Sequence, residues 1–352
     1  MIDPVAGSRR NFLGLSMFAL AAGATGLSSP AARASAASPE KKAPPSAIHA
    51  HEYWAKRGEI SLYIYRKTSG AIRSGQSSLP ILFLAHGSSV SSRPTFDLTV
   101  PGHDDYSLMD KFVEYGFDVW TMDFEGYGHS SSSAGNSNVA DGVEDLKAAS
   151  ELVFKETGQT RFHLYGESGG ALRAGAFAME EPERVRRLVL SAFTWTGKGS
   201  ETLAKRTEDG EYYRTHNTRP RDRNMVRSIF TRDKPGTSDP AVAEAMADAE
   251  LALGSSVPTG TYVDMTTKLP LVDPTKLTMP VQIVRGEFDG IATEDDLLAF
   301  FGKLATRDRE FVVLPGAAHS VALGVNRSQF WHVMRAFLDM PPRQDTVNAG
   351  KP

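Results

Sequence analysis

A serine bracketed by glycines constrains the fold of this chain more than any other feature of its sequence. Gly166 and Gly170 each stand two positions from Ser168. The run 161–165 before them has the pattern of a short strand, and the run 169–179 after them has a helical pattern. A side chain exposed on so sharp a turn strains the backbone, and flanking glycines let strand and helix approach without a clash. The pattern predicts a buried strand, a tight turn that presents Ser168, and a helix.

The rest of the chain alternates the same two patterns. Short continuous apolar runs are typical of strands buried on both faces, and amphipathic stretches of helices. The predicted strands are residues 51–56, 60–66, 80–85, 117–124, 161–165, 185–192, 280–285 and 310–314. The predicted helices are residues 106–115, 139–155, 169–179, 295–304 and 328–340. This alternation implies βαβ units, so we expect an α/β fold with a mostly parallel central sheet of about eight strands and helices on both faces.

Residues 195–274 interrupt this alternation. The stretch lacks the buried-strand signal, is polar and rich in arginine, and has a helical pattern at 241–253. We interpret it as a helical lid inserted into a core made of residues 48–194 and 275–341, and not as a second strand-based domain. Within it, residues 198–234 carry ten Lys or Arg against six Asp or Glu. A solvated helix surface is the simplest explanation of this excess, and attraction of an acidic substrate such as a half-ester is the alternative.

The N-terminus resembles a twin-arginine signal peptide. Arg9 and Arg10 stand before a weakly apolar stretch, residues 12–27, and the Ala-Arg-Ala sequence at 32–34 provides a cleavage site. Such a signal is an address read by a receptor and then removed. The resemblance implies that residues 1–34 engage the twin-arginine export machinery and that the mature product is periplasmic or secreted. The alternative is a basic tail beside a short helix.

Composition narrows the possible chemistry. The chain has no cysteine, which excludes disulfides, thiolate metal sites and a cysteine nucleophile. A formal net charge of -3 gives no reason to expect nucleic acid or an anionic membrane as a partner. After the N-terminus no stretch approaches the roughly 18 apolar residues of a membrane span, so we expect no stable membrane anchoring. Residues 35–47 are expected to form a flexible linker, and residues 342–352 a C-terminal tail.

His319 is the best-placed base for Ser168. A serine hydroxyl is a weak nucleophile until a base takes its proton. His319 follows the predicted strand 310–314 and a short loop, at the edge of the sheet where open α/β folds place their sites. His332 lies inside an amphipathic helical pattern instead, which favours a structural role.

Asp289 is the predicted acid. It follows the predicted strand 280–285 directly and can accept the Nδ1–H of His319, which fixes the tautomer and stabilises the imidazolium. Glu287, two residues earlier, is the alternative acid. The helix predicted after Ser168 has its N-terminus at the serine. Its dipole and the free N–H of Gly169 would stabilise negative charge that develops there during the reaction.

Taken together, these residues resemble the α/β-hydrolase superfamily, in its lidded serine esterase branch. The chain order serine, aspartate, histidine is the one used there. Residues 123–130 (DFEGYGHS) look like the turn D-x-R-G-x-G-x-S that follows a core strand, with Glu125 in place of the usual arginine. The resemblance implies that Ser168 is the nucleophile, and that the N–H groups of Ser88 and Gly169 form an oxyanion hole. His86 is expected to brace the turn that carries Ser88.

The predicted function is cleavage of a small-molecule carboxylic ester through an acyl-enzyme intermediate. The expected pocket residues are His86, Gly87, Glu167, Phe193 and Trp195. We expect no cofactor and no metal, because no H-E-x-x-H or G-x-x-x-x-G-K-[ST] pattern occurs. The same triad also supports C–C bond hydrolysis, lactone hydrolysis or cofactor-free perhydrolysis. A non-catalytic binding module of the same fold is the alternative from another functional class, and the complete set of reactive residues disfavours it.

Overall fold

The computed structural model describes residues 47–70, 74–75 and 77–341, and the predicted signal peptide and C-terminal tail lie outside them. The linker expected at 35–47 also lies outside, apart from its last residue. In the described part of the chain, no helix combines the length and the apolar character needed to cross a membrane.

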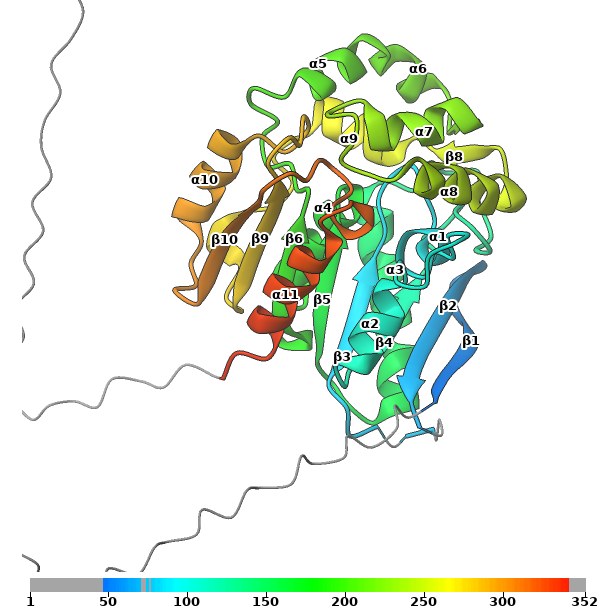
Figure 1. Ribbon diagram of the computed structural model, residues 1–352, viewed down its shortest axis with the longest axis vertical. Coiled ribbons are helices and arrows are strands. Elements are labelled where there is room, and N and C mark those ends of the chain that lie inside the picture. The colour runs from blue at the N-terminus through cyan, green and yellow to red at the C-terminus, as the bar shows by residue number, and fades with distance from the viewer. Residues whose placement is uncertain (1–46, 71–73, 76, 342–352) are drawn as a thin grey trace, which may run out of the picture. The chain divides into compact units, whose positions relative to one another are not determined.

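A central sheet of eight strands organises the structure (Figure 1). Its order is β1-β2-β4-β3-β5-β6-β9-β10. The strands are β1 (Ile48–Arg57), β2 (Ile60–Ser69), β3 (Ile81–Ala85), β4 (Asp118–Met122), β5 (Phe162–Glu167), β6 (Val185–Ser191), β9 (Val281–Gly286) and β10 (Arg309–Leu314). β1 and β2 form an antiparallel hairpin, β2 pairs antiparallel with β4, and every other pairing is parallel. The predicted fold class, a mostly parallel α/β sheet of the α/β-hydrolase type, is confirmed.

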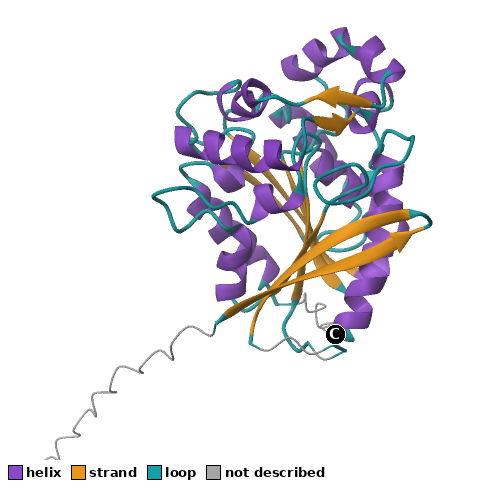
Figure 2. Cartoon of the chain, turned by 90° about the vertical axis from the view of Figure 1, so that its right-hand side faces the viewer, coloured by secondary structure: helices purple, strands orange, loops and turns teal. Residues whose placement is uncertain are grey.

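Helices cover both faces of the sheet (Figure 2). α3 (Val139–Thr157), α4 (Gly169–Glu180) and α10 (Glu294–Lys303) contribute to one buried cluster. α1 (Ser92–Phe96), α2 (Leu108–Glu114) and α11 (Arg327–Leu338) contribute to the other. Neighbouring residues of one strand serve opposite faces, which is why the strands read as continuous apolar runs. Phe83 packs in the first cluster and Leu84 in the second, for example.

Local sequence signals explain where the elements end. α3 begins at a capping box in which the side chains of Asn138 and Asp141 each accept the other residue's backbone N–H. It ends at Gly158, whose φ of +73° suits glycine. The short helix α1 lies between residues 85 and 106, where the sequence predicts neither a helix nor a strand. Short 3-10 turns at Pro182–Arg184, Pro274–Lys276 and Val321–Leu323 complete the core.

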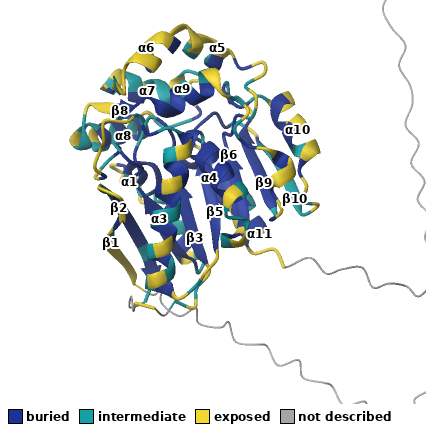
Figure 3. Cartoon of the chain, turned by 180° about the vertical axis from the view of Figure 1, so that it is seen from behind, coloured by how far each residue is buried: buried dark blue, intermediate teal, exposed yellow. Residues whose placement is uncertain are grey.

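The stretch 195–274 lies over the carboxyl ends of the strands (Figure 1). It contains α5 (Glu201–Glu208), α6 (Gly210–Thr215), α7 (Arg223–Thr231), α8 (Pro240–Leu253), α9 (Gly260–Thr267) and a two-stranded pair, β7 (Thr218–Pro220) with β8 (Ser256–Pro258). We call this stretch the lid. Much of its outer surface is exposed, whereas the central strands β3, β4, β5 and β9 are buried (Figure 3). Val226 and Met246 of the lid pack with Leu98 and Leu323 of the core in a third apolar cluster.

Candidate active site

Ser168 sits on a strained turn between β5 and α4. Its φ of +55° and ψ of -120° lie outside the regions that residues other than glycine commonly adopt. The flanking glycines are required by space, since a Cβ on Gly166 would lie 2.5 Å from the carbonyl oxygen of Gly170. A Cβ on Gly170 would collide with the carbonyl oxygen of Ala85 at the end of β3. The sharp turn predicted from the sequence is therefore present, and it points the serine away from the sheet.

The structure brings His319 and Asp289 to this serine. His319 follows β10, and its Nε2 lies 3.0 Å from the Oγ of Ser168. The Nδ1 of His319 lies 3.0 and 3.1 Å from the two carboxylate oxygens of Asp289, which follows β9. Because a carboxylate only accepts hydrogen bonds, this pairing assigns the imidazole proton to Nδ1 and leaves Nε2 free to accept the serine proton.

Asp289 is held as a charged carboxylate. Its Oδ1 also accepts the backbone N–H groups of Ile291 (2.9 Å) and Ala292 (3.1 Å). Burial alone would raise the pKa of Asp289, but His319 and these N–H donors outweigh it, so the pKa lies below the usual value. The lowered pKa favours the charged carboxylate of Asp289, which is the form that stabilises a protonated His319.

The two alternatives weighed from the sequence lie elsewhere. The Oε2 of Glu287 accepts the backbone N–H of Gly316 at 2.7 Å, outside the contact with His319. His332 is exposed on α11. Asp233 does approach, and its carboxylate, that of Asp289 and a nitrogen of His319 lie within 4.8 Å of one another. Since Asp289 and His319 already bond each other through such atoms, we assign no metal to this cluster.

The proposed oxyanion donors are adjacent. A Cβ on Gly169 would lie 3.2 Å from the backbone nitrogen of Ser88, so the Gly169 backbone and the Ser88 amide face each other. Within the described residues, neither amide has a hydrogen-bond acceptor. Tyr127 fixes the turn by donating its hydroxyl to the Ser88 carbonyl oxygen at 3.0 Å. Two unoccupied N–H groups beside Ser168 form an arrangement that suits an oxyanion.

His86 braces the turn from below. Its Nδ1 lies 2.8 Å from the carbonyl oxygen of Gly87, and its Nε2 accepts the backbone N–H of Phe124 at 3.2 Å. Its ring packs edge-on against Phe124 and Tyr127. Burial lowers the pKa of His86 to about 4, so the ring is neutral at ordinary pH. The residue is fully buried, as expected of a brace.

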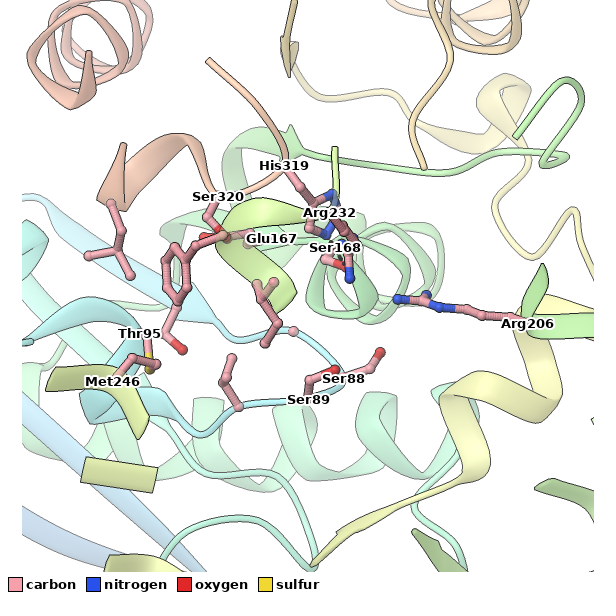
Figure 4. Close-up of a pocket in the computed structure, with 15 residues that line it drawn as sticks. Ser88, Ser89, Thr95, Glu167, Ser168, Arg206, Arg232, Met246, His319 and Ser320 are labelled. Carbon is pink, nitrogen blue, oxygen red and sulfur yellow. Dashed lines mark hydrogen bonds between the residues drawn. The ribbon is translucent and has the colours of Figure 1, made fainter. Parts of the chain in front are cut away.

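Ser168 opens into a cavity between core and lid (Figure 4). Counting the space open to solvent at its mouth, the cavity measures about 510 Å³. Its walls combine both parts of the chain. They are Gly87, Ser88, Ser89, Val90, Thr95, Glu167, Ser168, His319, Ser320 and Leu323 from the core, and Arg206, Ile229, Phe230, Arg232 and Met246 from the lid.

The expected pocket residues divide into two groups. Gly87 and Glu167 line the cavity, whereas His86, Phe193 and Trp195 do not. Phe193 is fully buried against the ring of Phe300 of α10, at 4.9 Å between centroids. Trp195 packs on the same ring and donates its Nε1–H to the carbonyl oxygen of Val272 at 3.1 Å. Both aromatic side chains pack against α10 because Phe300 offers them a buried apolar surface there.

Glu167 is a buried acid in the cavity wall. It is 7% exposed, and the hydroxyl of Tyr165 donates to its Oε2 at 3.1 Å. Burial raises the pKa of Glu167, although the nearby His319 and the tyrosine hydroxyl favour the charged form. Burial thus favours the uncharged form of Glu167 more than it would for an exposed glutamate.

Sequence reasoning missed the lid residues that reach the cavity. Arg206 belongs to α5, Arg232 follows α7, and Met246 belongs to α8. These three positions are far apart in the sequence, and nothing in their local patterns distinguishes them from the outer lid surface. The arginine excess at 198–234 was the one available signal.

Comparison with known proteins places this geometry in a family. A model described as serine aminopeptidase, S33, matches residues 105–324. The chain belongs to the S33 family of α/β-hydrolases. The match spans the turn that carries Ser168 as well as Asp289 and His319, and it makes the protein a hydrolase by family. No curated protein matches the sequence significantly.

Solved structures share the fold of this S33 member at low sequence identity. E-2-(acetamidomethylene)succinate hydrolase matches with a TM-score of 0.60 and 20% identity, over 83% of this chain and 100% of that chain. The 2-hydroxy-6-oxo-6-phenylhexa-2,4-dienoate hydrolase of Rhodococcus sp. strain RHA1 has a TM-score of 0.59 and 18% identity, over 83% and 100%. The enol-lactonase of Burkholderia xenovorans LB400 has a TM-score of 0.59 and 15% identity, over 82% of this chain and 100% of that chain. At such identities the likeness shows the fold alone.

Proposed function

We propose that this protein is an exported serine hydrolase that cleaves small-molecule carboxylic esters through an acyl-enzyme intermediate. One observation carries the proposal: the Ser168 hydroxyl, the His319 imidazole and the Asp289 carboxylate form a continuous hydrogen-bonded chain at the wall of a cavity. Two free backbone N–H groups, those of Ser88 and Gly169, lie beside it. This is the arrangement that nucleophilic acyl transfer requires.

In the first half-reaction the Oγ of Ser168 attacks the ester carbonyl carbon while the Nε2 of His319 takes the hydroxyl proton. The carbonyl oxygen becomes an oxyanion that accepts hydrogen bonds from the N–H groups of Ser88 and Gly169. The carbon–alkoxy bond then breaks, and His319 gives its proton to the departing alcohol. Water repeats the sequence: it attacks the acyl carbon, His319 takes one of its protons, and the Ser168 oxygen leaves and is reprotonated.

The cavity favours an ester over the peptide that the family name suggests. An aminopeptidase binds a substrate with a free, positively charged amine close to the scissile bond. Here Arg206 and Arg232 line the cavity, and burial shifts Glu167 toward its neutral form. The two guanidinium groups would repel an ammonium group at the site.

A p-nitrophenyl ester series from acetate to palmitate tests the proposal. Wild type and Ser168→Ala are compared directly, with Ser133→Ala as a control because Ser133 is exposed and outside the cavity. We expect turnover by wild type and Ser133→Ala, almost none by Ser168→Ala, and covalent labelling of Ser168 by a fluorophosphonate. A folded wild type that is neither labelled nor active would support a binding module instead.

The same experiment extends to the related reactions. A vinylogous 1,5-diketone tests C–C cleavage, a lactone tests ring opening, and peroxide with a carboxylic acid tests perhydrolysis. Preference for one of these over every ester, by an enzyme that is still labelled at Ser168, would replace the ester assignment and leave the nucleophile in place.

Export is proposed on the N-terminal sequence alone. The paired arginines Arg9 and Arg10, the weakly apolar stretch after them and the Ala-Arg-Ala site are its support. Replacing both arginines with lysine should retain the full-length protein in the cytoplasm of a host with twin-arginine export. Unchanged release of the mature chain would contradict the proposal.

A further inference from the structure

Most arginines of the lid contact a carboxylate, but two that lie near the cavity do not. The paired contacts are Arg214 with Glu211, Arg221 with Glu250, Arg223 with Glu244 and Asp248, and Arg227 with Glu244. Throughout the described ranges, no carboxylate oxygen lies within 4.0 Å of a side-chain nitrogen of Lys205, Arg206 or Arg219. Among the lid arginines that the structure describes, Arg206 and Arg219 are thus the two without such a carboxylate, whereas Arg232 has Asp233 at 3.4 Å.

These charges gather in one chamber beside the cavity. A hollow that meets the catalytic cavity at Arg206 and Arg232 has four cationic residues and one acidic residue in its wall: Lys205, Arg206, Arg219, Arg232 and Asp209. The guanidinium carbons of Arg206 and Arg219 lie 5.3 and 4.9 Å from the centre of the Tyr262 ring. Like charges brought together in this way repel one another unless an anion lies between them.

The two arginines shared by both hollows have unused donors. The hydrogen bond recorded for Arg206 goes to the sulfur of Met265 at 3.9 Å, and thioether sulfur is a weak acceptor. The Nε of Arg232 lies 3.4 Å from the carboxylate of Asp233 without hydrogen-bond geometry, and it is buried with no partner in the described chain. Burial and the nearby charge of Arg232 lower the pKa of Arg206 to about 10. A buried donor without an acceptor is costly, so an anionic group that accepts a hydrogen bond from Arg232 would be favoured here.

The opposite wall of the cavity is apolar. Thr95 and Met246 lie on one side of Ser168 and Arg206 on the other (Figure 4). Phe230 and Leu323 add to the apolar wall. A substrate that uses the whole cavity thus has an apolar arm and an anionic arm on either side of the bond that Ser168 attacks.

We propose that the natural substrate is an ester that bears a carboxylate a few bonds from the scissile carbonyl, and that Arg206 and Arg232 bind this carboxylate. The fork of N–H donors on a guanidinium matches the two oxygens of a carboxylate. The inference rests on the proposed ester hydrolysis and specifies its substrate class.

The test compares matched esters. The monoethyl esters of succinate, glutarate and adipate are measured by pH-stat against ethyl pentanoate, and ethyl 4-carbamoylbutanoate serves as the uncharged isostere of monoethyl glutarate. Arg206→Met and Arg232→Met keep most of the aliphatic length while removing the donors. Arg214→Met is the matched control, because Arg214 is an exposed lid arginine paired with Glu211 outside the cavity.

We expect wild type and Arg214→Met to prefer at least one half-ester over its uncharged counterpart about tenfold or more in kcat/KM. In Arg206→Met and Arg232→Met this ratio should fall about 10- to 100-fold, chiefly through a higher KM, as for hydrogen bonds to a charged group. Wild type that hydrolyses the uncharged esters equally well or better overturns the inference.

Failure of the inference and failure of the proposed function are separable. Turnover of none of these esters by an enzyme that a fluorophosphonate still labels at Ser168 overturns the carboxylate proposal and leaves the nucleophile. Absence of labelling from folded wild type would count against the proposed function itself.

Discussion

Glu250 of the lid accepts hydrogen bonds from both the backbone N–H and the hydroxyl of Ser91 of the core, at 2.6 and 2.9 Å. Arg221 contacts the same carboxylate and also donates to the carbonyl oxygens of Glu250 (2.7 Å) and Gly254 (2.8 Å). Glu250, Ser91 and Arg221 are all buried. Ser91 is three residues from Ser88, so this contact ties the lid to the loop that carries the proposed oxyanion donor.

This contact predicts a pH-dependent stability. Burial raises the pKa of Glu250 from 4.5 to about 7, despite Arg221 and Ser91. The folded state therefore binds the extra proton between these values, and its stability falls as pH rises through that window. Relative to Glu250→Gln, which cannot titrate, wild type should lose up to about 3 kcal/mol between pH 4.5 and 8. Urea unfolding of both proteins across this range measures the difference.

Glu244→Gln on the same helix is the control for that experiment. Glu244 is partly exposed and pairs with Arg223 and Arg227, which lower its pKa. A lowered pKa gives the opposite sign, because stability is then lost as pH falls. The Glu250 prediction would be refuted in two cases. The free energy of unfolding of wild type relative to Glu250→Gln could stay constant with pH, or it could rise with pH as expected for wild type relative to Glu244→Gln.

A second prediction concerns the buried ion pair of Arg66 and Asp118 between β2 and β4. Two parallel hydrogen bonds of 2.8 and 2.7 Å join them, and both side chains are almost fully buried. Arg66→Met leaves Asp118 buried without a counter-charge and should cost about 3–5 kcal/mol of unfolding free energy. Arg93→Met breaks the exposed contact with Glu52 and should cost about 1 kcal/mol or less. Similar losses from the two variants, measured by denaturant unfolding, would contradict the prediction.

The fold was predictable because its signals are local. A strand buried on both faces must be apolar at successive positions, as Phe83 and Leu84 are. The turn at Ser168 needs glycine two positions before and two positions after the serine, so the requirement can be recognised from a few neighbouring residues. The eight predicted strands accordingly match β1 to β6, β9 and β10, with differences at their ends.

The cavity wall was less predictable because its residues are selected by tertiary packing. Phe193 and Trp195 follow β6 and were expected in the pocket, yet α10 offers them a buried apolar surface. Arg206 and Met246 come from lid helices whose relative placement no local pattern encodes. Glu125 stands where the resemblance to the family's turn leads one to expect arginine, and it pairs with Arg57 of β1, a partner separated by a long stretch of chain.

A third prediction tests the glycine requirement of the turn. Gly166→Ala places a Cβ 2.5 Å from the backbone of Gly170, where no flexible side chain can yield. We expect a loss of about 3 kcal/mol or more, or failure to fold. Gly302→Ala is the matched control, because a Cβ there meets nothing within 4 Å on α10. Alanine in a helix should stabilise it by about 0.5–1 kcal/mol. Thermal unfolding of the two variants measures both effects. A Gly166→Ala variant as stable as Gly302→Ala would show that the turn relaxes without cost, and would contradict the prediction.

The final prediction separates the two carboxylates that follow β9. Asp289 bonds the Nδ1 of His319, whereas Glu287 bonds the backbone N–H of Gly316. Asp289→Asn should lower kcat for a p-nitrophenyl ester by about 10⁴-fold, because the amide stabilises the wrong tautomer of the histidine and cannot stabilise the imidazolium. Glu287→Gln should leave kcat within about threefold, since its partner is a surface loop outside the reaction centre. Equal losses in the two variants would show that the acid assignment is wrong. A loss confined to Asp289→Asn, with fluorophosphonate labelling of Ser168 slowed in parallel, is the result expected if Asp289 acts through His319.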